Sequence, residues 1–171
     1  MYEITEEPFS DAPHRLRFGS GRICGITRDG VPYLTVETEE TFHQMHLPCC
    51  FFRQWLCIVD NKYVRLIDLE TLEYQEISLK EIKSGGFGIG YFGYFEPLPD
   101  MLLFSTASAV FALDSSGKLL WQTDDLAVDG ILFQGVTADG RIEIACCMDP
   151  PEPEGWCDRL LDLKTGKECT H

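Results

Sequence analysis

The stretch VFALDSSGKLLW, residues 110–121, decides the fold of this chain. It predicts a strand, a tight turn opened by Asp114 and closed by Gly117, and a second strand that ends on Trp121. Related stretches surround Asp68 (YVRLIDLETLEYQ) and Asp162 (CDRLLDLKTGKEC), so the three aspartates lie 46 and 48 residues apart. A recurrence of that length indicates a repeated small antiparallel unit.

The rest of the chain reads as further short strands. Two-residue turns such as Asp29-Gly30 and Asp139-Gly140 separate apolar runs, and roughly twelve to fourteen strands at about ten-residue spacing fit the chain. We therefore expect one all-β domain over residues 1–171: three to four antiparallel blade-like sheets in a small or incomplete propeller-like array, with a β-sandwich as the alternative. Residues 1–13 are polar and predict an N-terminal arm, and residues 78–83 one helical turn.

The charge balance bears on the partners. The chain has 28 Asp and Glu against 14 Lys and Arg, a formal net charge of −14. Nucleic acid is disfavoured because its affinity depends on Lys and Arg contacts to phosphates, and anionic membrane surfaces are disfavoured for the same reason. A basic protein partner, or solubility alone, fits this charge.

The sequence also predicts the compartment. It holds no apolar run of 18 residues, and its acidic N-terminus lacks the order of a signal peptide. We therefore expect a cytoplasmic protein whose eight cysteines are free thiols. Cys24, Cys57 and Cys146 lie within apolar runs, which predicts that they pack as small hydrophobic side chains.

One cluster of residues has metal-binding chemistry. His43, His46, Cys49 and Cys50 fall within eight residues, and zinc or copper accepts such ligands. The spacing argues against a site, because adjacent cysteines rarely reach one metal and the two histidines would point to opposite faces of a strand. We expect no metal or other cofactor, and cysteines buried beside a strand turn. No residue pattern supports a catalytic assignment.

A glycine motif needs separate treatment. Gly88, Gly90 and Gly93 satisfy G-x-G-x-x-G. That motif binds a pyrophosphate only where it opens a helix, and here aromatic residues and then Pro97 and Pro99 surround it. We expect a glycine-aromatic strand or loop, with any exposed aromatic side chains forming a contact surface.

Two acidic stretches are the candidate partner-binding sites. The first contains Glu37, Glu39 and Glu40. The second is the DPPEPEGW loop, with Asp149, Glu152, Glu154 and Trp156. Its prolines fix a spacing unlike that of a calcium loop, whereas a rigid acidic loop anchored by tryptophan suits protein binding.

The quoted stretches resemble known repeats. VFALDSSGKLLW resembles a blade of the β-propeller superfamily, especially the quinoprotein and WD-repeat types; DLKTGK matches it in part, and Leu72 replaces the glycine near Asp68. The last 75 or so residues, with LLWQTDDLAVDGILF, DPPEPEGW and LLDLKTG, also resemble a group of small uncharacterised bacterial proteins. Some members of such groups lie beside toxin genes as immunity proteins.

These observations lead to a functional expectation. We expect a non-catalytic protein-binding module, such as an immunity protein whose acidic surface covers the basic cleft of a toxin. The alternatives are a small-molecule-binding or metal-binding β-protein or enzyme with its site at the blade loops, and a scaffold unit that packs on copies of itself through open sheet edges.

Overall fold

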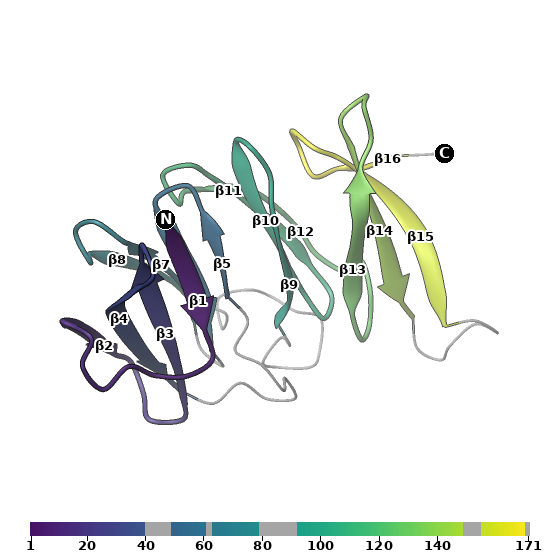
Figure 1. Ribbon diagram of the computed structural model, residues 1–171. Helices are drawn as coiled ribbons and strands as arrows, with labels where there is room; N and C mark the ends of the chain where they lie inside the picture. Colours follow the sequence, from purple (N-terminus) through teal and green to yellow (C-terminus); the bar gives the residue numbers. More distant parts are fainter. Residues whose placement is uncertain (40–48, 61–62, 79–91, 149–154, 170–171) are drawn as a thin grey trace.

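The computed structural model of the protein describes residues 1–39, 49–60, 63–78, 92–148 and 155–169. Over these ranges the chain forms four four-stranded sheets (Figure 1), and the predicted all-β, blade-like class is confirmed. Of the predicted helical turn, Ser78 ends a strand and the other residues lie outside the described ranges. No helix in the described part of the chain could cross a bilayer.

The sixteen strands follow one another in four groups. Sheet A contains β1 (Tyr2–Thr5), β2 (His14–Arg17), β3 (Arg22–Arg28) and β4 (Val31–Thr38). Sheet B contains β5 (Cys49–Phe52), β6 (Trp55–Val59), β7 (Tyr63–Asp68) and β8 (Tyr74–Ser78). Sheet C contains β9 (Phe92–Pro97), β10 (Met101–Thr106), β11 (Val110–Asp114) and β12 (Leu119–Thr123). Sheet D contains β13 (Ile131–Val136), β14 (Arg141–Cys147), β15 (Trp156–Asp162) and β16 (Glu168–Cys169).

Sheet A departs from the predicted organisation in two ways. Tyr2–Thr5, placed in an N-terminal arm by the sequence reading, forms β1, and β1 pairs with β3. The strand order is β1-β3-β4-β2, and β2 runs parallel to β4. Sheets B, C and D are antiparallel meanders, as predicted.

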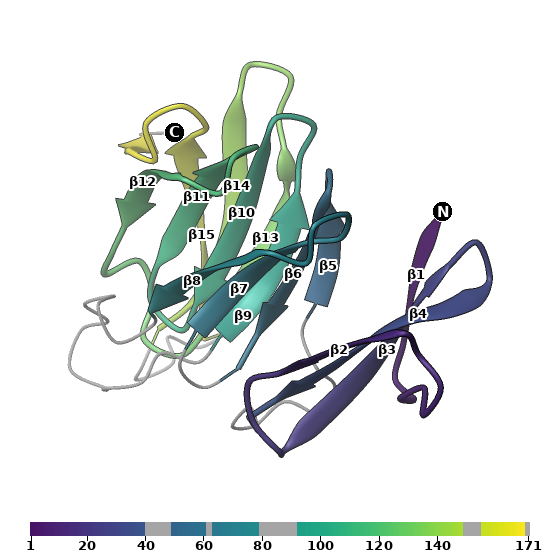
Figure 2. The same cartoon turned by 90° about the vertical axis from the view of Figure 1, so that its left-hand side faces the viewer.

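The sheets stack in an open row, with sheet A at one end and sheet D at the other (Figures 1 and 2). Three apolar layers hold the row together, one between each pair of neighbouring sheets. Phe104 and Phe111 stack at 4.7 Å in the layer between sheets B and C. All eight cysteines are free, and Cys24, Cys57 and Cys146 are buried as predicted.

The aspartate turns are built alike in sheets B, C and D. The carboxylates of Asp68, Asp114 and Asp162 accept hydrogen bonds from backbone N–H groups two to four residues later. Each turn then needs a residue with positive φ. Gly117 (82°) and Gly166 (69°) supply it, and Leu72 adopts 60° at the same place in sheet B.

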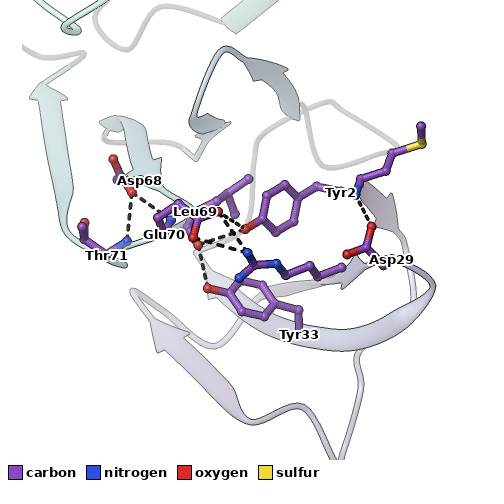
Figure 3. Close-up of polar contacts among 9 residues, drawn as sticks. Tyr2, Asp29, Tyr33, Asp68, Leu69, Glu70 and Thr71 are labelled. Atoms are coloured by element: carbon purple, nitrogen blue, oxygen red, sulfur yellow. Dashed lines mark hydrogen bonds and ion pairs between the residues drawn. The ribbon is translucent and has the colours of Figure 1, made fainter.

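An aromatic donor from the preceding sheet ties each turn into the row. The hydroxyl of Tyr33 donates to the carbonyl of Leu69 at 2.6 Å, and Tyr2 reaches the same carbonyl and Glu70 (Figure 3). The indole N–H of Trp55 donates to Ser115 O at 2.9 Å, and that of Trp121 to Leu163 O at 3.0 Å. The acceptor is in every case the residue after the turn aspartate, so the 46–48-residue recurrence positions one sheet on the next.

Candidate functional site: the outward face of sheet D

Sheet D has one face that the rest of the molecule covers. Ile142, Ile144 and Cys146 alternate along β14 and are fully buried against Leu103, Val110 and other residues of sheet C. Because successive side chains of a strand point to opposite faces, the residues between them face away from sheet C. Sheet D ends the row, so this second face has no neighbouring sheet (Figure 1).

The strand register identifies the residues of that second face. Leu132, Ala145 and Asp158 lie opposite one another on β13, β14 and β15, as do Glu143 with Leu160 and Cys147 with Trp156. Gln134 joins them, because its amide donates to the Asp158 carboxylate at 3.1 Å. We call these eight residues the outward face of sheet D.

The outward face combines exposed apolar area with negative charge. Trp156 is 45% exposed and Leu132 36% exposed. Glu143 and Asp158 are exposed beside them, and none of the eight residues is basic. The nearby cation on β15, Arg159, belongs to the covered face, where it holds both carboxylate oxygens of Glu168 at 3.1 Å. The arrangement is a tryptophan and leucine contact area bordered by carboxylates, which is the composition of a protein-docking surface.

The opposite end of the row is closed by the chain itself. The face of sheet A that points away from sheet B carries Gly25 and Thr35, and residues 7–9 cross it. Thr35 exchanges hydrogen bonds with the backbone of Phe9, at 3.0 and 3.3 Å. A Cβ at Gly25 would lie 2.6 Å from the Phe9 ring and 2.5 Å from Glu7 O, so the segment fits tightly. The predicted arm is therefore β1 followed by a cover.

The structure divides the predicted acidic site residues. Glu37 is only 9% exposed, and its carboxylate pairs with Arg15 at 3.4 Å and Arg17 at 3.1 Å. Glu39 is partly exposed and borders a shallow depression with Arg17. Trp156 lies on the outward face of sheet D. Glu40, Asp149, Glu152 and Glu154 lie outside the described residues.

The predicted histidine-cysteine cluster is described only at its cysteines. Cys49 and Cys50 lie in β5 and are partly buried, and burial raises the pKa of Cys49 to about 11. His43 and His46 lie outside the described residues. Within the described ranges no group of three His, Cys, Asp or Glu side chains could hold a metal ion.

Of the glycine motif, Gly93 is described and Gly88 and Gly90 are not. Gly93 lies in β9. A Cβ at this position would lie 2.3 Å from Ser105 Oγ, which accepts from the N–H of Tyr94 at 3.0 Å. The glycine therefore permits a close approach between β9 and β10.

Sequence reasoning missed Leu132 and Leu160 as surface residues. A signal was present, because ILF at 131–133 and LL at 160–161 place apolar side chains on both faces of their strands. That pattern predicts a strand covered twice, and the structure covers it once.

The comparisons with known proteins bear on the fold. No family model matches the chain, and no curated protein matches its sequence. Among solved structures, the AfRom2 CNH domain, a β-propeller, is similar with a TM-score of 0.50 at 11% identity over 99% of this chain. The match covers 53% of that structure, so the chain spans about half its length. At this identity the likeness shows a propeller-like fold.

Proposed function

We propose that the chain is a non-catalytic protein-binding module whose outward face of sheet D docks a basic protein. The observation that carries the proposal is the uncovered face with Trp156 and Leu132 beside Glu143 and Asp158, at the end of a row whose other end is closed. Exposed tryptophans that meet a pocket on a partner contribute a large share of binding energy. Carboxylates around such an anchor accelerate encounter with a basic partner and select against acidic ones.

Charge favours a basic protein over a second copy of this chain. A two-fold dimer through this face would bring the Asp158 and Glu143 carboxylates of both copies together, and each copy has a formal net charge of −14. Like charges brought together at an interface disfavour association. A head-to-tail ring would need the far face of sheet A, which the Phe9 segment covers.

Neutralisation of a toxin is the role we propose for this binding. The chain resembles a group of small bacterial proteins through the Asp129-Gly130 pair, Trp156 and the Asp162 turn, and these residues all belong to sheet D or its flanks. Cys147 O accepts from the N–H groups of Val128 and Asp129, and the Trp156 ring lies beside Gly130. Inhibition would follow from occlusion: the face covers the basic surface that the toxin uses for its own substrate.

The test begins with capture on the immobilised chain from cells that encode it. The captured basic protein is then identified, expressed and titrated calorimetrically against variants. We expect Trp156→Ala to weaken binding at least about tenfold, and Asp158→Lys to slow association and reduce its salt dependence. Matched controls are Tyr94→Ala, an aromatic residue 54% exposed on β9, and Asp124→Lys, which like Asp158 accepts from a glutamine.

Two results would overturn the proposal. One is a partner whose affinity is the same for Trp156→Ala and Asp158→Lys as for the controls. The other is a stable dimer in native mass spectrometry that Trp156→Ala dissociates, because the face would then bind a second copy.

A further inference from the structure

Sheet D contains a pair of cysteines in direct register. Cys146 on β14 lies opposite Cys157 on β15, and both side chains belong to the face covered by sheet C. Directly opposed residues of antiparallel strands have Cα atoms about 4.5–5.5 Å apart, and a disulfide requires about 4.4–6.8 Å. Both thiols are free, so a bridge could form with little backbone movement.

The two thiols have different surroundings. Cys146 is fully buried, and burial raises its pKa to about 12. Cys157 is partly exposed, and the Arg159 guanidinium donates a hydrogen bond to its sulfur. The same guanidinium is held by both oxygens of Glu168 at 3.1 Å, which fixes its position. An adjacent guanidinium favours the thiolate, which is the form that reacts with oxidants.

We propose that Cys146 and Cys157 form an oxidation site that closes to a cross-strand disulfide in the presence of a peroxide, with Cys157 attacking first. The Cys157 thiolate attacks one peroxide oxygen, the O–O bond breaks, and the products are the Cys157 sulfenate and water. After protonation of the sulfenate, the Cys146 sulfur attacks the S–OH group. The disulfide forms, and the departing hydroxide takes the Cys146 proton to give a second water. The thiols lose two electrons and the peroxide gains them.

A second opposed pair in the chain provides an internal comparison. Cys50 and Cys57 lie opposite one another on β5 and β6, and their thiols hydrogen-bond to each other. That contact and burial raise the pKa of Cys57, so this pair presents a protonated thiol. We expect it to bridge more slowly than Cys146 and Cys157 at the same peroxide concentration.

The experiment treats the reduced full-length chain with hydrogen peroxide and maps the products by mass spectrometry. Cleavage after Glu152 or Glu154 separates Cys146 from Cys157, so a bridge joins two peptides that reduction releases. We expect the bridge in the native chain and in Cys147→Ser, whose sulfur lies on the opposite face. Arg159→Gln should slow its formation about tenfold, in line with about one unit of thiol pKa, while Arg159→Lys should slow it less.

Other results would overturn the proposal. They include oxidation of Cys157 to sulfinic acid without a bridge, a preferred bridge from Cys147, and a rate that Arg159→Gln leaves unchanged. The mapping of the native chain decides the question even if a variant fails to fold. The proposal is independent of the proposed function, since the two cysteines lie on the face of sheet D opposite the docking residues.

Discussion

Sheets C and D have the same strand order and the same aspartate turn, yet sheet C is covered on both faces and sheet D on one. In sheet C, alternate residues of β10 enter different layers: Leu102 and Phe104 pack toward sheet B, and Leu103 packs toward sheet D. In sheet D, β14 has Ile142 and Ile144 on its covered face and Glu143 between them. A single charged residue within the alternation thus separates an internal sheet from a terminal one.

The turn contacts differ between the two sheets as well. Leu160 pairs with Cys169 two residues before Asp162, as Ala112 pairs with Trp121 two residues before Asp114. Cys169 therefore occupies in sheet D the place of the tryptophan that sheet C uses to hold its neighbour. The comparison teaches that the repeat encodes both the sheet and its contact to the next one, and that sheet D retains only the former.

The largest expected effect comes from removing a side chain of the doubly covered sheet. Phe104→Ala should lower the free energy of unfolding by ~3–5 kcal/mol, because the ring is fully buried and stacked on Phe111. Leu132→Ala, on the outward face of sheet D, should change it by less than ~1 kcal/mol. Urea denaturation of both variants measures the difference. Equal losses would mean that the outward face is covered in solution.

The next effect concerns the turn glycines. Gly166→Ala forces a residue with a side chain into φ +69°, and its Cβ would lie 2.3 Å from Cε3 of Trp121. Gly140→Ala meets the same kind of strain at φ +81° with no atom within 4 Å. We expect a loss of about 1 kcal/mol for Gly140→Ala and a further ~1–3 kcal/mol for Gly166→Ala, measured by urea denaturation. Similar losses would show that the Asp162 turn does not bear on sheet C.

A smaller effect isolates the aromatic hydrogen bond. Trp121→Phe keeps an aromatic ring between sheets C and D but removes the N–H that donates to Leu163 O. The expected loss is about 1–2 kcal/mol, the cost of leaving that carbonyl without its donor, measured by thermal and urea unfolding. Trp156→Phe, on the outward face, should stay within ~0.5 kcal/mol. Matching losses for both tryptophans would remove the distinction between the two sheets.

The repeat was predictable where its signal is local. Asp114 with Gly117, and Asp29 with Gly30, identify turns because few residues tolerate positive φ, and Asp29 (54°) and Gly30 (78°) both adopt it. The Asp68 turn could be inferred from the aspartate alone. The structure shows that Leu72 keeps the glycine conformation, and its side chain packs into the layer between sheets A and B.

Long-range pairing was not predictable from the sequence. The four residues YEIT carry a weak strand signal, and their partner β3 begins 17 residues after β1 ends. Phe9 likewise covers Gly25 and Thr35 through contacts that no local pattern encodes. The outward face of sheet D is also a tertiary property, because apolar alternation in β13 and β15 shows which residues could be covered and not whether a neighbour is present.

The smallest expected effect tests the aspartate turn itself through pH. The Ser116 hydroxyl and the N–H groups of Lys118 and Ser116 hydrogen-bond the Asp114 carboxylate and hold its pKa below the ordinary value. Since the folded pKa lies below the unfolded value of about 3.9, the stabilisation is complete above that pH and is lost as the pH falls through the folded pKa. Ser116→Ala should therefore lower the melting temperature slightly at pH 7, and the difference from the native chain should shrink toward pH 2–3. Ser10→Ala, at an exposed serine, is the control and should match the native chain throughout. A Ser116→Ala deficit that grew on acidification would contradict this account of the turn, because it would require the hydroxyl to stabilise the protonated carboxyl.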